Sequence, residues 1–124
     1  MLDASRVKHV SECNKVDKPW GYEVLWAKTD EYVAKLMYIE NSCRMSLQYH
    51  QKKEETIYVM RGELIVWENE NDEDMVVLKP GHIYHVKPGM VHRFGATKNS
   101  PVMLMEVSTN HLQDVIRLQD DYKR

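Results

Sequence analysis

Short segments rich in β-branched and aromatic residues recur along the first 109 residues, and this rhythm constrains the fold more than any other feature of the sequence. Turn signals such as Arg61-Gly62 and Lys79-Pro80-Gly81 separate the segments, because glycine and proline favour reversals of the chain. Helical periodicity is nearly absent before Asn110. The pattern predicts strands over residues 22–27, 32–39, 56–60, 63–68, 75–78 and 102–107. Many short strands at such intervals are typical of an all-β sandwich or barrel.

The length of 124 residues suits one domain with a single core. We expect an N-terminal arm over residues 1–17, a β-barrel over 18–109, and a tail over 110–124 that forms a short helix or an arm on the body. The acidic run at 68–75 lacks the glycine and the ligand spacing of a calcium loop, which favours a solvated hairpin tip.

The charge distribution excludes some partners. The net charge is -2, and the basic residues are scattered among acidic ones, so we do not expect binding to nucleic acid. No apolar run approaches the roughly 20 residues that cross a bilayer, and the first residues lack the apolar core of a signal peptide. We therefore expect no membrane partner and a cytoplasmic location.

Four side chains have the spacing of a metal site. Gln48 and His50 are separated by one residue, so on a strand both would project from the same face. Glu55 follows after four residues, and His92 comes later, behind the turn Pro88-Gly89. Imidazole, carboxylate and amide groups all bind divalent metals of the zinc, manganese, iron or nickel type. A lone histidine is more often a hydrogen-bonded, half-buried residue, so the joint spacing carries this prediction.

The same spacing resembles the two motifs of the cupin family. The first motif is matched by Gln48-x-His50, four residues, Glu55, six residues and Gly62, with Ser42 in place of the leading glycine and Gln48 in place of the first histidine. The second is matched by Gly81, then Lys87-Pro88-Gly89 and then His92, with Lys87 in place of a proline and Ala96 in place of an asparagine. The resemblance implies a single-domain jelly-roll barrel, also called a double-stranded β-helix.

A narrower resemblance covers most of the chain after Asp17. The segments KPWGYE, LQYH, GMVHRF and the ending MEVSTNHLQDVIRLQDDYKR are similar to the isomerase domain of bifunctional phosphomannose isomerase/mannose-1-phosphate guanylyltransferases. This resemblance implies that mannose 6-phosphate and fructose 6-phosphate are interconverted through an enediol. It also implies a divalent ion, with zinc expected first and manganese, iron, cobalt or nickel as alternatives. The implied ligands are Gln48, His50, Glu55 and His92.

Isomerisation also requires an acid-base group, for which the candidates are Lys53, His85 and Glu106. Lys53 stands where the bifunctional enzymes carry an arginine, and lysine lacks the planar fork of that residue, so we expect Lys53→Arg to raise any weak activity. His85 lies before the second turn, where a core histidine bonded to the backbone is the simpler interpretation. Glu106 lies in the apolar run VMLMEV, where a carboxylate is costly to bury without a partner.

A sugar phosphate, the expected small-molecule partner, requires cations. Four basic residues are candidates: Lys35, Arg93, Arg117 and Arg124. Lys35, Arg117 and Arg124 match basic residues of the isomerase domain, although an exposed lysine or arginine is usually only solvated.

Two other functions fit the motifs. One is a non-catalytic, metal-containing cupin that binds a sugar phosphate or a nucleotide sugar. The other is an iron dioxygenase, which prefers a histidine-rich ligand set, so Gln48 argues against it. An open barrel edge would favour pairing of edge strands in a homodimer.

Overall fold

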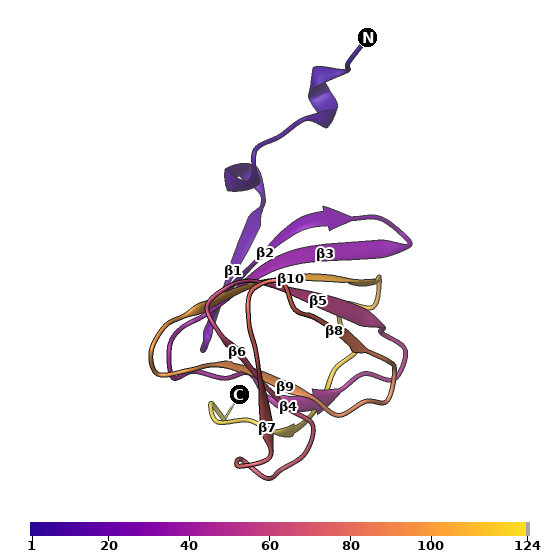
Figure 1. Ribbon diagram of the computed structural model, residues 1–124. Helices are drawn as coiled ribbons and strands as arrows, with labels where there is room; N and C mark the ends of the chain where they lie inside the picture. Colours follow the sequence, from indigo (N-terminus) through magenta and orange to yellow (C-terminus); the bar gives the residue numbers. More distant parts are fainter. Residues whose placement is uncertain (124) are drawn as a thin grey trace.

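The computed structural model describes residues 1–123, which form short strands and two 3-10 turns (Figure 1). The turns are η1 (Ala4–Arg6) and η2 (Val10–Glu12). The strands are β1 (Asn14–Lys18), β2 (Gly21–Lys28), β3 (Tyr32–Ile39), β4 (Leu47–Tyr49), β5 (Glu55–Arg61), β6 (Leu64–Trp67), β7 (Met75–Leu78), β8 (Ile83–Val86), β9 (Arg93–Ala96), β10 (Val102–Thr109) and β11 (Ile116–Gln119). No helix within residues 1–123 is long and apolar enough to cross a membrane.

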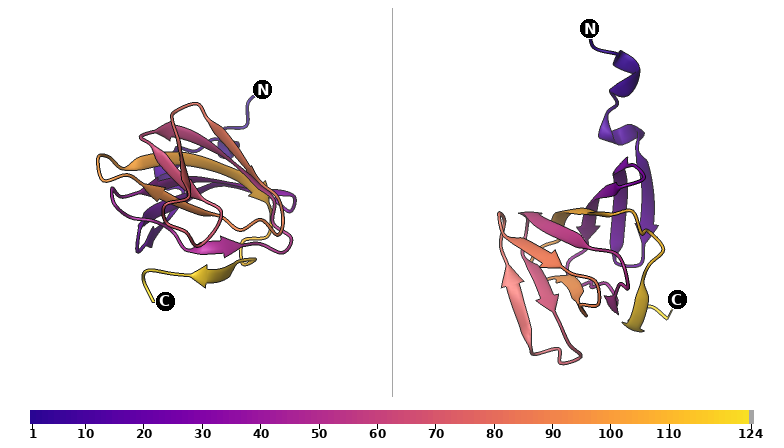
Figure 2. Two further views of the ribbon diagram at one scale, coloured as in Figure 1. Left: turned by 60° about the horizontal axis from the view of Figure 1, so that its bottom comes forward. Right: turned by 90° about the vertical axis from the view of Figure 1, so that its right-hand side faces the viewer.

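The strands form two layers (Figures 1 and 2). One layer is a six-stranded antiparallel sheet in the order β1-β2-β3-β10-β5-β8. The other layer combines the sheet β7-β6-β9 with the pair β11-β4, and backbone bridges from Gln48 to His92 and from Arg44 to Gly95 join the two parts. This arrangement confirms the expected all-β jelly roll.

The hydrophobic core lies between the two layers, and the inward face changes character along β10. Val102 and Leu104 are fully buried among apolar side chains from both layers. The next inward positions on the same strand are Glu106 and Ser108, which are also buried. Because alternate residues of a strand face the same side, the polar positions continue the line of the core. One part of the interior is therefore apolar and the adjoining part is polar.

The structure confirms the strands whose bounds were predicted and adds five for which the pattern gave no bounds. The prediction for 32–39 coincides with β3 and that for 75–78 with β7. These added strands are β1, β4, β8, β9 and β11, which are three to five residues long. Of the acidic run 68–75, residues 68–74 form the turn between β6 and β7, as expected for a hairpin tip, and Met75 begins β7.

Both terminal segments contribute strands to the sheets. The described part of the C-terminal tail contains β11, which pairs with β4, so the tail is an arm on the body and not a helix. At the other end, β1 pairs with β2 from Asn14 onward, so the expected arm boundary at residue 17 falls inside a strand.

Ser42 occupies the position of the leading glycine in the first cupin motif, and its φ of 63° is the left-handed conformation that glycine adopts most easily. Gly62, which closes that motif, has φ 75°, and a Cβ there would lie 2.2 Å from the carbonyl oxygen of Pro101. The backbone geometry of the motif is thus retained although its first glycine is replaced.

Candidate metal centre and its cavity

Three elements bring the predicted ligands together. His50 directly follows β4, Glu55 begins β5 after a short turn, and His92 directly precedes β9. The backbone amide of Gln48 donates to the carbonyl of His92 at 3.0 Å, and that of His92 donates to the carbonyl of Gln48 at 2.9 Å. This reciprocal pairing fixes the two ligand-bearing segments next to each other.

His50, Glu55 and His92 form a buried group that could hold a metal ion. Their ligand atoms all lie within 4.8 Å of one another. The Glu55 Oε1 atom is 3.1 Å from His92 Nε2 and 3.7 Å from His50 Nε2. None of the three residues is more than 2% exposed.

The second nitrogen of each imidazole determines what the ring offers to the centre. His50 Nδ1 lies 2.6 Å from the backbone carbonyl oxygen of Asp114, and His92 Nδ1 lies 3.0 Å from that of Met90. A carbonyl oxygen only accepts, so each Nδ1 carries the proton and each Nε2 presents a lone pair. Neither Nε2 has a hydrogen-bond partner among the described residues. Two imidazole lone pairs that converge on the Oε1 atom of a carboxylate suit a divalent cation.

Gln48 lines the same cavity as His50. The hydroxyl of Ser46 donates to Gln48 Oε1 at 2.6 Å, which orients the side-chain amide. An amide oxygen has two lone pairs, so one remains available to a metal. Gln48 as the fourth ligand therefore stays a prediction with a compatible geometry.

Lys53 links Glu55, one of the candidate metal ligands, to a second buried carboxyl group. Its Nζ lies 3.0 Å from Glu55 Oε2 and 3.1 Å from Glu106 Oε2. Burial acts to lower the pKa of Lys53, but the charges of Glu106 and Glu55 outweigh it and raise the pKa. Burial likewise acts to raise the pKa of Glu55, but the imidazoles of His50 and His92 and the charge of Lys53 hold it well below its usual value.

Glu106 differs from Glu55 in its protonation. Burial and the neighbouring charge of Glu55 raise the pKa of Glu106 to about 8. Near neutral pH the site therefore contains an ionised Glu55, a charged Lys53 and a Glu106 that is mostly protonated.

A cavity of about 420 Å³ lies between the sheets, and His50, Lys53 and Glu106 line it. Lys35 on β3 also lines it, and its Nζ donates to Glu23 Oε1 at 3.1 Å. Arg117 lines it from the C-terminal strand β11 and is exposed to solvent. The size is within the range of small-molecule sites, roughly 300–1,000 Å³.

Two predicted acid-base or phosphate-binding residues of the described range, His85 and Arg93, do not line this cavity. His85 points to the outside, where its Nε2 lies 2.6 Å from Glu54 Oε2. Arg93 is buried and donates to the carbonyl oxygens of Met45 at 2.9 Å and Gln119 at 3.3 Å, so it ties the segment before β4 to β11. Arg124 lies outside the described residues.

Asp114 is a site residue that the sequence did not indicate. Besides the carbonyl contact with His50, its carboxylate accepts the backbone amides of Gln51, Lys52 and Lys53 at 3.0, 2.6 and 2.9 Å. These bonds hold the turn between two ligands and lower the pKa of Asp114 to about 2. The only sequence signal was the resemblance of the closing segment to the isomerase domain, which did not single out this residue.

Comparison with known families accounts for this geometry. The model of a cupin domain matches residues 35–108, which is more than half of the chain and includes the whole metal group. The chain belongs to the cupin domain family. A comparison with curated proteins finds no match.

Solved structures share this cupin fold at low sequence identity. The polyketide cyclase RemF from Streptomyces resistomycificus is 15% identical over 95% of this chain and 86% of that chain, with a TM-score of 0.76. A cupin-superfamily sugar phosphate isomerase from Silicibacter pomeroyi is 16% identical over 82% and 73%, with a TM-score of 0.67. KdgF from Halomonas sp. is 17% identical over 80% and 89%, also at 0.67. At these identities the comparisons establish the fold alone.

Proposed function

We propose that this cupin is a metal-dependent sugar-phosphate isomerase of the mannose 6-phosphate isomerase type. The observation that carries the proposal is that one cavity is lined by His50 of the candidate metal ligands, by the buried pair Lys53 and Glu106, and by basic side chains. The segments similar to phosphomannose isomerase domains support it, as does the fold shared with a structure described as a sugar phosphate isomerase.

The residues divide into three roles in this proposal. His50, Glu55 and His92, with Gln48 as the fourth ligand, would hold the ion. A divalent ion bound there would stabilise the negative charge that develops on the oxygens of an enediol. Glu106 lies in the same cavity and is positioned to carry a proton between adjacent carbons, with Lys53 at 3.1 Å to hold its carboxyl group in place.

The phosphate group would bind at the mouth of the cavity. Arg117 is exposed there, and its guanidinium can bind two phosphate oxygens at once. Lys35 lies deeper and is already paired with Glu23, so it contributes positive charge without a direct contact. Arg117 is therefore the first choice for the phosphate ligand.

A second function has a specific observation in its favour. The ammonium group of Lys53, which stands at the position of an arginine in the bifunctional enzymes, is held between two carboxyl groups of its own chain. An ammonium group that is already bound by two carboxyl groups does not bind a substrate. This contact favours a non-catalytic cupin that binds a sugar phosphate or a nucleotide sugar at the metal.

The experiment uses zinc-loaded and manganese-loaded protein and a panel of hexose and pentose phosphates in coupled isomerase assays. We expect turnover of mannose 6-phosphate that is lost in Glu106→Gln, retained in the exposed control Glu40→Gln, and raised in Lys53→Arg. Stabilisation of the protein by a sugar phosphate in thermal unfolding without turnover would select the binding function. Neither turnover nor stabilisation with any member of the panel would refute both.

A further inference from the structure

The segment KPWGYE, residues 18–23, places two charged side chains in the cavity between the sheets. Lys18 and Glu23 both line that cavity. Lys18 ends β1 and Gly21 begins β2, and these two residues pair across the turn that joins the strands. Trp20, within the turn, is 2% exposed and lines the same cavity, so it anchors the turn. The turn therefore fixes where both charged side chains enter the cavity.

Glu23 contacts two ammonium groups through one carboxylate oxygen. Its Oε1 lies 3.1 Å from Lys35 Nζ and 3.8 Å from Lys18 Nζ. Within residues 1–123 both ion pairs of Glu23 use Oε1, so Oε2 is left to accept from a ligand. The side chains of Glu23 and Lys35 are 14% and 13% exposed, whereas that of Lys18 is 28% exposed. Lys18 is therefore the cation of this cluster that a ligand reaches first.

Strand pairing places this cluster on the same face of the sheet as Glu106. Lys35 pairs with Glu106, and Leu25, two residues after Glu23, pairs with Lys35. Alternate residues of a strand face the same side, so Glu23 and Leu25 both face inward. Glu23 lies two strands away from Glu106, which is roughly 10 Å at a strand spacing of about 4.8 Å. That separation is comparable with the length of an extended hexose phosphate, so one sugar can contact both carboxyl groups.

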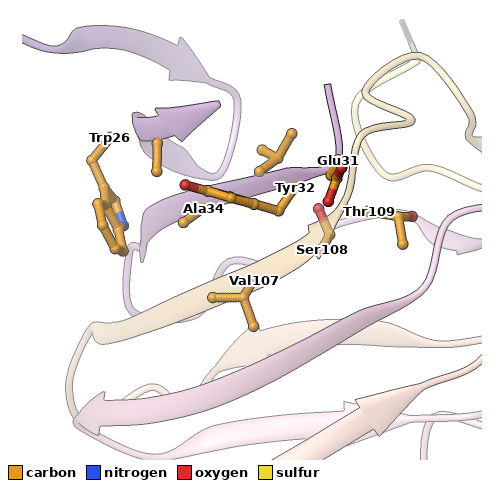
Figure 3. Close-up of a pocket in the computed structure, with 9 residues that line it drawn as sticks. Trp26, Glu31, Tyr32, Ala34, Val107, Ser108 and Thr109 are labelled. Atoms are coloured by element: carbon orange, nitrogen blue, oxygen red, sulfur yellow. The ribbon is translucent and has the colours of Figure 1, made fainter. Parts of the chain in front are cut away.

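The opposite face of the same sheet offers no comparable site. A groove of about 600 Å³ lies there, because Val107 follows the inward Glu106 on β10 (Figure 3). Figure 3 shows Trp26, Tyr32 and Val107 around it, and the only charged residue among those that line it is Glu31. A sugar has a hydroxyl on nearly every carbon, and each hydroxyl that is left without a partner on binding costs free energy. A sugar is therefore better matched by the cavity between the sheets.

The charges of the cluster decide which part of a sugar phosphate it fits. A phosphate group at Lys18 or Lys35 would also approach the carboxylate of Glu23, and like charges repel. A hydroxyl group both donates and accepts, so neighbouring hydroxyls can donate to Glu23 Oε2 and accept from the ammonium group of Lys18. The cluster therefore suits the hydroxyl groups of the sugar, and the phosphate is left to Arg117.

We propose that Glu23 and Lys18 bind neighbouring hydroxyl groups of the sugar and determine its selection, with Lys35 as the positioning residue that holds Glu23. This inference rests on the proposed sugar-phosphate ligand. It goes beyond that proposal because it assigns the residues that distinguish a sugar phosphate from phosphate alone.

Calorimetric titration of the zinc-loaded full chain with mannose 6-phosphate and, separately, with inorganic phosphate tests this role. We expect the wild type to bind mannose 6-phosphate more tightly. Glu23→Gln should weaken mannose 6-phosphate binding about 10-fold, because a charged acceptor forms the stronger hydrogen bond. The same variant should bind inorganic phosphate at least as tightly as the wild type, because the cavity loses a negative charge.

The matched control is Asp17→Asn, on the strand that pairs with β2. The side chain of Asp17 is 89% exposed and lies 4.0 Å from Lys15 Nζ, so its replacement should change neither affinity. Lys18→Met is a second variant at the more exposed end of the cluster. It should weaken mannose 6-phosphate binding about 10-fold and inorganic phosphate binding by a smaller factor, since phosphate loses only a distant attraction.

The outcomes separate this inference from the proposed function. If the wild type prefers mannose 6-phosphate and Glu23→Gln and Lys18→Met keep that preference, the role of the cluster is overturned and the sugar-phosphate ligand stands. Equal weakening of both ligands in Glu23→Gln would show that Glu23 only supports the fold, which also overturns its role in selection. A wild type that binds mannose 6-phosphate no more tightly than inorganic phosphate would overturn the inference and the proposed ligand together.

Discussion

Replacement of Lys53 by methionine should destabilise the metal-free protein much more than the metal-bound protein. Lys53 Nζ is 3.0 Å from Glu55 Oε2. At that distance, an effective dielectric constant of about 20 gives an attraction of about 5 kcal/mol. Removing one partner of a buried pair costs about 3–5 kcal/mol. Because Glu106 is mostly protonated near neutral pH, the variant leaves only Glu55 uncompensated, and we expect a loss of about 3 kcal/mol.

A divalent ion would compensate Glu55 in place of the lysine. With saturating zinc, Lys53→Met should therefore lose much less stability than in a chelator, and its zinc affinity should rise about 100-fold, since 1.4 kcal/mol corresponds to a factor of ten. Urea unfolding at pH 7 with EDTA and with zinc measures the first effect, and calorimetric titration measures the second. Lys52→Met, at the exposed neighbouring position, is the control. Equal losses with and without zinc would refute the competition between Lys53 and the ion.

Three further predictions concern Asp114 and Ser42. Asp114→Ala should weaken zinc binding about 10- to 100-fold in a titration, because the turn between His50 and Glu55 loses three hydrogen bonds. The hydrogen bonds lower the pKa of Asp114 to about 2. The contribution of Asp114 to stability is therefore present above the usual carboxyl pKa and is lost as the pH falls toward 2. In urea unfolding at pH 4 and pH 2, the wild type should lose more stability between the two pH values than Asp114→Asn. Ser42→Gly should raise the free energy of unfolding by about 1 kcal/mol, because Ser42 holds φ 63°, and a decrease would show that its hydroxyl matters more than its backbone.

The metal group could be predicted because its signal is local. The one-residue spacing of Gln48 and His50 places both at one end of a short strand, and the turn before His92 returns that residue to the same region. The bounds of β4 and β9, the strands next to His50 and His92, were not predicted, since these strands have only three and four residues and contain polar groups or glycine. The ligand spacing was thus more informative than strand propensity at the site itself.

The structure departs from the sequence-based predictions where strand register or a backbone atom places a side chain. His85 pairs with Thr56, so it lies on the opposite face from Glu55. The local sequence does not predict that register. The contact that orients His50 is made by a backbone carbonyl oxygen at residue 114, which any amino acid provides. Glu106 was expected to need a partner, and the structure supplies Lys53 at 3.1 Å.

The most direct test of the account is the zinc content of the purified protein, measured by elemental analysis after dialysis against a weak chelator. We predict one ion per chain in the wild type and almost none in His50→Ala or His92→Ala. His85→Ala, which removes an exposed imidazole on the outward face, should keep the wild-type content. A zinc content that is the same in the wild type, His50→Ala and His92→Ala would contradict the assignment of the metal centre.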